Sequence, residues 1–202
     1  NISGSDCTMI GYQAGLVNLA TGNTFVGSNA GVANTSGSSN IFVGLGAGAS
    51  NIIGVRNVFV GTTAGANSIA SDNTFLGDSA GLFTTVGSGN VFLGSGTGVF
   101  NVSGTFNTFV GYQAGRKNLV NGNTFVGFQA GLNNISGNIN TFIGQGAGRN
   151  SAGTQNVFIG FDAGENETLN QKLYIANTNT TTPLIGGDFT SGVTINKAVT
   201  PT

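Results

Sequence analysis

The residues that could carry chemistry are few and scattered. The chain of 202 residues has no histidine or tryptophan, one cysteine, and seven Asp plus Glu against six Lys plus Arg, for a formal net charge of −1. Acid–base catalysis and metal binding need several such side chains within reach of one another, and a phosphate-binding surface needs clustered Lys and Arg. The composition therefore predicts that the chain is not an enzyme, uses no cofactor or metal, and does not bind nucleic acid.

The short motifs in the chain do not change this interpretation. Asp72, Asp78 and Asp162 recur at no fixed position, whereas a calcium-binding β-roll needs an Asp in every repeat. The stretch 44–48, Gly-Leu-Gly-Ala-Gly, has a spacing found in dinucleotide-binding loops but begins no helix. Triplets that match the Asn-x-Ser/Thr glycosylation acceptor, as chance alone predicts in a chain rich in these residues, include those that begin at Asn34, Asn101 and Asn134.

Cysteine usage and hydropathy are equally uninformative about chemistry. Cys7 has no second cysteine to pair with, so no disulfide can staple the chain. No apolar run approaches the ~20 residues of a membrane helix, which predicts that the chain does not insert into a membrane.

A repeat organises residues 7–164. The phrase Asn-Thr-Phe-Val-Gly at 23–27, followed by Ala30-Gly31, returns at 123–127, followed by Ala130-Gly131. Ten copies are present, and their phrase-ending glycines lie 16 or 17 residues apart: Gly11, Gly27, Gly44, Gly61, Gly77, Gly94, Gly111, Gly127, Gly144 and Gly160. A second glycine follows four residues after each one. Glycine at this density would destabilise helices, so helical repeats are excluded.

The phrase itself has the composition of a short strand. Phe lies two residues before the first glycine in nine copies, flanked by Thr, Val or Ile on one side and by Val, Leu or Ile on the other. Such side chains pack well on a pleated surface. We expect the phenylalanines to form the structural core: Phe25, Phe42, Phe59, Phe75, Phe92, Phe109, Phe125, Phe142 and Phe158.

A period of 16–17 residues fits one coil of a narrow parallel β-solenoid, or β-roll. We expect ten coils, each with two short strands and two turns, the second and weaker strand carrying Leu19, Ile52, Ile69, Val102, Leu119 and Ile135. Stacked at about 4.8 Å per coil, they would form a rod about 45–50 Å long. An asparagine four residues before the first glycine is expected to form a hydrogen-bonded ladder along the rod: Asn23, Asn40, Asn57, Asn73, Asn90, Asn107, Asn123, Asn140 and Asn156.

The expected strand is apolar on both faces. If Phe25 points into the coil, Thr24 and Val26 point out of it, because side chains alternate along a strand. A strand that is apolar on both faces is normally covered on both. We therefore expect other copies of the chain to cover an oligomer interface made of Val26, Val43, Val60, Leu76, Leu93, Val110, Val126, Ile143 and Ile159.

The position after the first glycine follows no packing rule and is a candidate contact surface. It holds Tyr112, Phe128 and Phe161 among polar residues, and Arg116, Lys117 and Arg149 lie nearby in the sequence. A sugar ring could stack on such aromatic side chains, so these six residues are our candidates for receptor contact. The alternative is that the rings simply pack against those of neighbouring coils.

The repeat ends near residue 167, and residues 168–202 have a different composition. Both prolines of the chain, Pro183 and Pro201, lie in this Thr- and Asn-rich stretch. Short strands are predicted at 172–176, 184–189 and 193–195. We expect a repeat domain of residues 1–167 and a C-terminal β cap or connector of residues 168–202, leading to a downstream domain.

The phrase Gly-Asn-Thr-Phe-Val-Gly-x-x-Ala-Gly, over residues 7–164, resembles the glycine-rich repeats of bacteriophage tail fibres and contractile-injection-system fibres. More distantly it resembles the heads of trimeric autotransporter adhesins, which usually carry smaller aliphatic residues in place of Phe. The segment 172–189 resembles the stretch that follows such repeats, commonly ahead of a self-cleaving chaperone domain. The resemblance implies a homotrimer of parallel β-rolls whose aliphatic column packs around the three-fold axis.

These observations predict an extracellular fibre segment of a phage tail or injection apparatus. It would give reach and present a multivalent surface for a glycan or protein receptor on the host cell, with itself and other tail or fibre proteins as partners. One alternative is a bacterial surface adhesin head. A second, an ice-binding solenoid, is disfavoured because the Thr24, Thr108 and Thr124 column is interrupted by Ile and Val.

Overall fold

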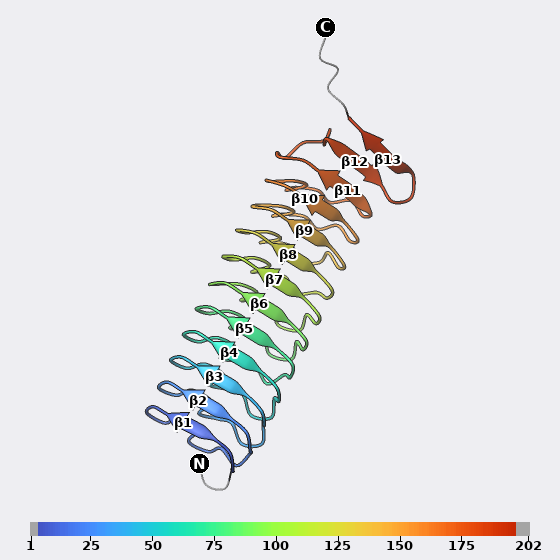
Figure 1. The fold of residues 1–202 in the computed structure, drawn as a ribbon. Coiled ribbons are helices and arrows are strands. Elements are labelled where there is room, and N and C mark those ends of the chain that lie inside the picture. The colour runs from blue at the N-terminus through green and yellow to red at the C-terminus, as the bar shows by residue number, and fades with distance from the viewer. Residues whose placement is uncertain (1–3, 197–202) are drawn as a thin grey trace.

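The computed structural model describes residues 4–196, and over these residues the chain is an all-β solenoid of about ten turns with no helix (Figure 1). Each of the first ten coils contributes one three-residue strand to a single sheet. The strands are β1 (Thr8–Ile10), β2 (Thr24–Val26), β3 (Ile41–Val43), β4 (Val58–Val60), β5 (Thr74–Leu76), β6 (Val91–Leu93), β7 (Thr108–Val110), β8 (Thr124–Val126), β9 (Thr141–Ile143), β10 (Val157–Ile159), β11 (Lys172–Ile175), β12 (Ile185–Asp188) and β13 (Gly192–Ile195).

The sheet follows sequence order from β1 to β13, and its register is fixed by the repeat. From β1 to β11 the strands are parallel, and the phenylalanines of β2–β10 lie opposite one another in successive coils, as Phe25 does opposite Phe42. Because every coil repeats the same inward and outward positions, stacking them produces columns of equivalent residues along the rod. The β-solenoid predicted from the sequence is therefore confirmed.

The interior on the strand side is a continuous stack of aromatic rings. All nine phenylalanines of the repeat have no exposed surface. Phe92 and Phe109 are typical, with ring centroids 4.9 Å apart and ring planes within 3° of parallel. Met9 packs against the first ring and Tyr174 stacks on the last, Phe158, at 5.2 Å. Burial of these rings, at about 1.5–3 kcal/mol each, is the main apolar contribution to the stability of the coils.

The asparagine column also forms a ladder, but its bonds differ from those expected. The side chains bond mainly to the backbone of the next coil rather than to each other. Oδ1 of Asn107 accepts a hydrogen bond from the backbone N–H of Asn123, and its Nδ2 donates to the carbonyl of Val120, both at 2.8 Å. Each buried amide thus satisfies two backbone groups that the narrow coil would otherwise leave unpaired.

A second buried polar column was not anticipated from the sequence. It lies three residues after the second glycine, and in the first nine copies its members are fully buried: Asn18, Asn34, Asn51, Ser68, Thr84, Asn101, Asn118, Asn134 and Ser151. The fixed spacing from the glycine is the signal that could have revealed it. Burial of Asn34, Asn101 and Asn134 also means that the glycosylation triplets that begin at these three residues cannot serve as acceptors in the folded chain.

The two glycine columns are required for different reasons. At the first glycine the backbones of adjacent coils are too close for a side chain: a Cβ on Gly127, where φ is +138°, would lie 2.4 Å from the carbonyl oxygen of Gly144. At the second glycine the phenylalanine ring of the same coil fills the space, and a Cβ on Gly131 would lie 2.4 Å from the ring of Phe125. The repeat thus combines close backbone approach with a positive φ.

The expected second strand of each coil is absent over residues 4–196, and the prediction of two strands per coil was wrong. Between the second glycine and the next asparagine the backbone curls instead of extending. The N–H groups of Thr35, Ser36 and Gly37 all bond to one carbonyl, that of Ile52, which a regular strand ladder cannot do. The side chains assigned to this strand point to solvent, with 37–52% of their surface exposed: Leu19, Ile52, Ile69, Val102, Leu119 and Ile135.

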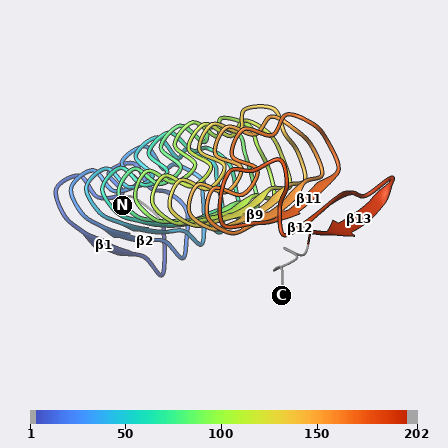
Figure 2. The same ribbon diagram turned by 90° about the horizontal axis from the view of Figure 1, so that it is seen from above.

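The C-terminal part continues the sheet and then reverses its direction. The predicted strands at 172–176, 184–189 and 193–195 correspond to β11, β12 and β13. β11 pairs in parallel with β10, whereas β12 and β13 are antiparallel. The β12–β13 hairpin extends beyond the outline of the coils (Figure 2).

Among the described residues there is no helix with the length and hydropathy required to cross a membrane.

Candidate functional site

The outward face of the strands carries two apolar or Thr-containing columns that run along the whole rod. In β2–β10 the central residue is buried and the two flanking side chains are at least partly exposed, as in β4 and β7. Exposure in the column after the phenylalanine reaches 49% at Leu76 and 40% at Ile143. This column is the predicted oligomer interface, and in a single chain it forms a continuous aliphatic stripe facing solvent.

A second exposed apolar stripe lies in the return half of the coils, which is the segment between the second glycine of one copy and the asparagine that begins the next copy. It consists of the side chains that were wrongly assigned to a second strand, including Ile52, Val102 and Ile135. Exposed side chains add to it at Ile53 and Val86, each with 58% of its surface in contact with solvent. The rod therefore presents two distinct apolar stripes, of which sequence reasoning recognised one as a surface.

The predicted receptor-contact residues divide into separate groups. Tyr112 and Phe128 lie in adjacent coils and stack with ring centroids 5.6 Å apart. Phe161 is 47% exposed and lies two coils beyond Phe128. The equivalent residue of the intervening coil is Gln145. The three rings therefore do not form one uninterrupted strip.

The basic candidates also have different surroundings. Arg149 is held between two carboxylates, with nitrogen to oxygen distances of 3.1 Å to Asp162 and 3.2 Å to Glu165. Arg116 lies over the ring of Phe100, 5.4 Å from its centroid. Lys117 is exposed. Arg149 is thus neutralised within the chain, whereas Arg116 is in none of the ion pairs among residues 4–196.

Tyr112 and Arg116 line a surface cavity of about 310 Å³ in the coils of β5, β6 and β7. Phe83, Phe100 and Asp78 also line it, and sequence reasoning did not identify them as contact residues. Phe83 and Phe100 stack with centroids 5.5 Å apart. Both lie two residues after the second glycine of their coil, a shared position that could have indicated their proximity.

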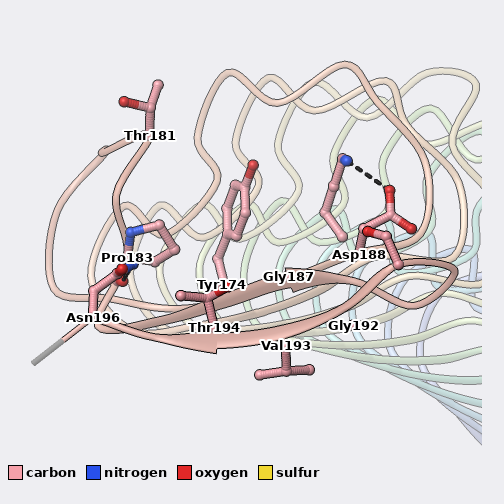
Figure 3. A pocket seen from close by; sticks show the side chains of 12 residues that line it. Tyr174, Thr181, Pro183, Gly187, Asp188, Gly192, Val193, Thr194 and Asn196 are labelled. Carbon is pink, nitrogen blue, oxygen red and sulfur yellow. Dashed lines mark hydrogen bonds and ion pairs between the residues drawn. The ribbon is translucent and has the colours of Figure 1, made fainter.

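A larger cavity, about 490 Å³, lies at the C-terminal end beside β11–β13 (Figure 3). Tyr174 stands above the sheet, and Gly187 and Gly192 also line the cavity (Figure 3). Lys172 and Asp188 line the cavity and form an ion pair of 2.8 Å between Nζ and Oδ2. The hydrogen bond from Lys172, with two more from Thr190, holds the pKa of the Asp188 carboxyl below its usual range.

Tyr174 ends the column of aromatic rings. Its hydroxyl donates a 2.6 Å hydrogen bond to Oε2 of Glu167, which occupies the position of the second polar column in its coil. Burial, followed by this bond and the charge of Glu167, raises the pKa of Tyr174 to about 12. The hydroxyl is protonated at neutral pH, so Tyr174 closes the stack as a neutral group.

No group of three or more His, Cys, Asp or Glu side chains that could hold a metal ion occurs among residues 4–196. Comparisons with protein-family models, with curated proteins and with solved structures return no match.

Proposed function

We propose that this chain is a structural segment of a homotrimeric fibre, of the kind that gives reach to a phage tail or injection apparatus, and that its outer surface attaches to a host cell. The observation that carries the proposal is the aliphatic stripe on the outward face of β1–β10. Soluble single chains rarely leave a continuous apolar stripe of this extent in water. Cover by other copies of the chain removes it from solvent.

The presence of two stripes supports a cyclic assembly. When three copies are arranged around an axis, each copy contacts its two neighbours through different surfaces, a heterologous arrangement that closes on itself. The strand stripe and the return-half stripe are two such surfaces, and both repeat once per coil. Rods that associate in register can then match side chains along their full length.

The in-register stack supports a mechanical role. Each coil is bonded to the next through backbone hydrogen bonds, a phenylalanine stack and an asparagine ladder, so the rod is reinforced along its axis. Three rods packed together resist bending more than one does, and any weak surface contact is presented three times. We propose that the C-terminal hairpin closes the end of the rod or connects it to the next part of the fibre.

The oligomeric state tests the proposal directly. Sedimentation or light scattering at micromolar concentration is expected to give three times the 20.2 kDa mass of one chain. The double variant Val60→Asp with Val110→Asp places charges in the strand stripe and is expected to dissociate the assembly. Thr62→Asp is the matched control, because the equivalent position of the next coil already holds Asp78. A folded monomer in the unmodified protein would contradict the proposal.

The genes beside the coding sequence test the choice of apparatus. Neighbouring tail-assembly genes are expected for the fibre that we propose. A downstream segment encoding a membrane anchor would instead indicate a bacterial surface adhesin.

A further inference from the structure

The aromatic column that contains Tyr112 and Phe128 is interrupted at the coil of β6. One face of the Tyr112 ring stacks on Phe128, which lies in the next coil towards the C-terminus. In the next coil towards the N-terminus the equivalent residue is Ser95, and in the one after that it is Asp78. Ser95 and the adjacent Gly96 are too small to continue the stack, and the cavity of about 310 Å³ lies beside them. The cavity therefore occupies the place that a further ring of this column would fill.

The wall of the cavity is formed by a second stack in the same coils. Phe83 packs on Phe100, and the guanidinium of Arg116 covers the other side of Phe100. Val99, only 5% exposed, is among the lining residues. A guanidinium stacked on a ring keeps its N–H groups free at the edge to donate hydrogen bonds. Arg116 can thus receive an anionic group without giving up an existing ion pair.

Polar groups line the remaining parts of the cavity. Asp78 lies two coils from Tyr112 and accepts a 3.1 Å hydrogen bond at Oδ2 from Ser79, so its other oxygen is available to accept from a hydroxyl. Ser95 and Gln113 also line the cavity. The combination of one free ring face, one unpaired cation and several hydroxyl-binding groups is suited to a ring-shaped ligand with hydroxyls and a single acidic group.

We propose that this cavity binds an acidic sugar, a pyranose ring bearing a carboxylate, as a unit of a surface glycan. The apolar face of the sugar ring stacks on Tyr112 in the place of the missing aromatic residue. The carboxylate accepts hydrogen bonds from Arg116, and a hydroxyl at the opposite side donates to Asp78. This inference rests on the proposed attachment function and names the ligand class of that surface.

Binding is tested with two probes, a hexamer of galacturonic acid and a neutral hexamer of galactose, by titration calorimetry against the unmodified full chain. The acidic hexamer is expected to bind and the neutral one to bind at least about tenfold more weakly, because the charge-assisted bonds to Arg116 are lost. Equal binding of both hexamers, or binding of neither, would overturn the inference.

Variants locate the site. Ser95→Tyr fills the cavity with the missing ring and is expected to abolish binding while thermal stability is retained. Tyr112→Ser is expected to weaken binding about tenfold. Tyr12→Ser is its matched control, since Tyr12 holds the same column position in the first coil, far from the cavity. Arg116→Gln is expected to remove the preference for the acidic hexamer, and Lys117→Gln to preserve it. Binding that survives Ser95→Tyr would place the sugar elsewhere.

The mass of each sample separates the two proposals. A trimer that binds neither hexamer leaves the fibre proposal intact and removes the sugar site. A monomer that binds the acidic hexamer, with the predicted variant effects, retains the site and removes the fibre.

Discussion

The strand half and the return half of each coil differ in how strictly the residue type at the inward positions is repeated from coil to coil. In the strand half, one residue type recurs at each inward position: phenylalanine stacks on phenylalanine, and asparagine bonds to the backbone of the next coil. In the return half, the inward position accepts Asn, Ser or Thr, and the coil accepts 16 or 17 residues. The difference indicates that the same residue type is required wherever a side chain packs against the equivalent side chains of the two neighbouring coils.

In the return half, the outward side chains can vary from coil to coil. Its contacts between coils are made largely by backbone groups, as in the bonds from Thr35, Ser36 and Gly37 to Ile52. The outward side chains there can vary without disturbing the stack. The turns after the strand-ending glycine share this freedom, and the cavity beside Tyr112 lies among them.

The largest expected effect is the loss of one ring from the phenylalanine column. Phe92→Ala leaves a cavity between Phe75 and Phe109 and is expected to lower the free energy of unfolding by about 3–5 kcal/mol. Chemical denaturation at a fixed protein concentration measures this loss. Val102→Ala truncates a 43% exposed side chain of the return half and should cost far less. Equal losses for the two variants would contradict the contrast between the halves.

A side chain at the strand-ending glycine is expected to be nearly as disruptive. Gly127→Ala brings a Cβ within 2.4 Å of a carbonyl in the next coil, and we expect destabilisation of about 2–5 kcal/mol from the clash and the positive φ.

The control for this prediction lies in the return half. Gly122 also has a positive φ, +70°, but a Cβ there meets nothing closer than the 3.5 Å to Ile139. Gly122→Ala is expected to cost only the conformational strain, about 1–2 kcal/mol. Thermal unfolding of the two variants gives the comparison, and a greater loss at Gly122 would be inconsistent with it.

A smaller effect is expected at the two buried polar columns. Asn107→Ala removes both cross-coil hydrogen bonds and leaves two buried backbone groups unpaired, at a cost of about 1–3 kcal/mol. Asn101, in the second column, has no hydrogen-bond partner for either amide atom among the described residues. Asn101→Ser introduces the residue found at Ser68 and should change stability by less than about 1 kcal/mol. Denaturant midpoints at fixed protein concentration measure both changes.

The most local effect is expected where the strand column ends. The pKa of Tyr174 is raised from 10.0 to about 12, so the folded chain holds this proton more tightly than the unfolded chain does. The stabilisation from Tyr174 is complete below about pH 10 and is lost as the pH rises through about 12. Tyr174→Phe should lack this dependence, as measured by unfolding at several pH values between 9 and 12. A wild-type profile that is identical to that of Tyr174→Phe would show that the hydroxyl has no such role.

The strand half was largely predictable from the sequence and the return half was not. Three adjacent β-branched, aliphatic or aromatic residues before a glycine determine a strand and its inward phenylalanine. Ile52 and Val102 suggested a second strand because apolar residues in a short segment are typical of strands. The polar column that contains Asn101 was not predicted, because its residue type varies among Asn, Ser and Thr. Its spacing from the second glycine is nevertheless constant.

The candidate site shows the same division. Tyr112 was identified as a contact residue by its position in the repeat, and Arg116 by its nearness in the sequence. Phe83 and Phe100, which share a second repeat position, were not identified, and neither was Asp78, although it shares the position of Tyr112. Their proximity depends on how the turns project side chains between neighbouring coils.

The repeat by itself determined that the chain forms stacked coils with an aromatic column and an asparagine column, because a fixed period forces equivalent residues into register. The tertiary structure decided which side each remaining residue faces. It showed that the return half curls rather than extends, which exposes a second apolar stripe, and that the interrupted column beside Tyr112 leaves a cavity. These features depend on the path of the backbone between the glycines, and the pattern of residue types alone does not specify that path.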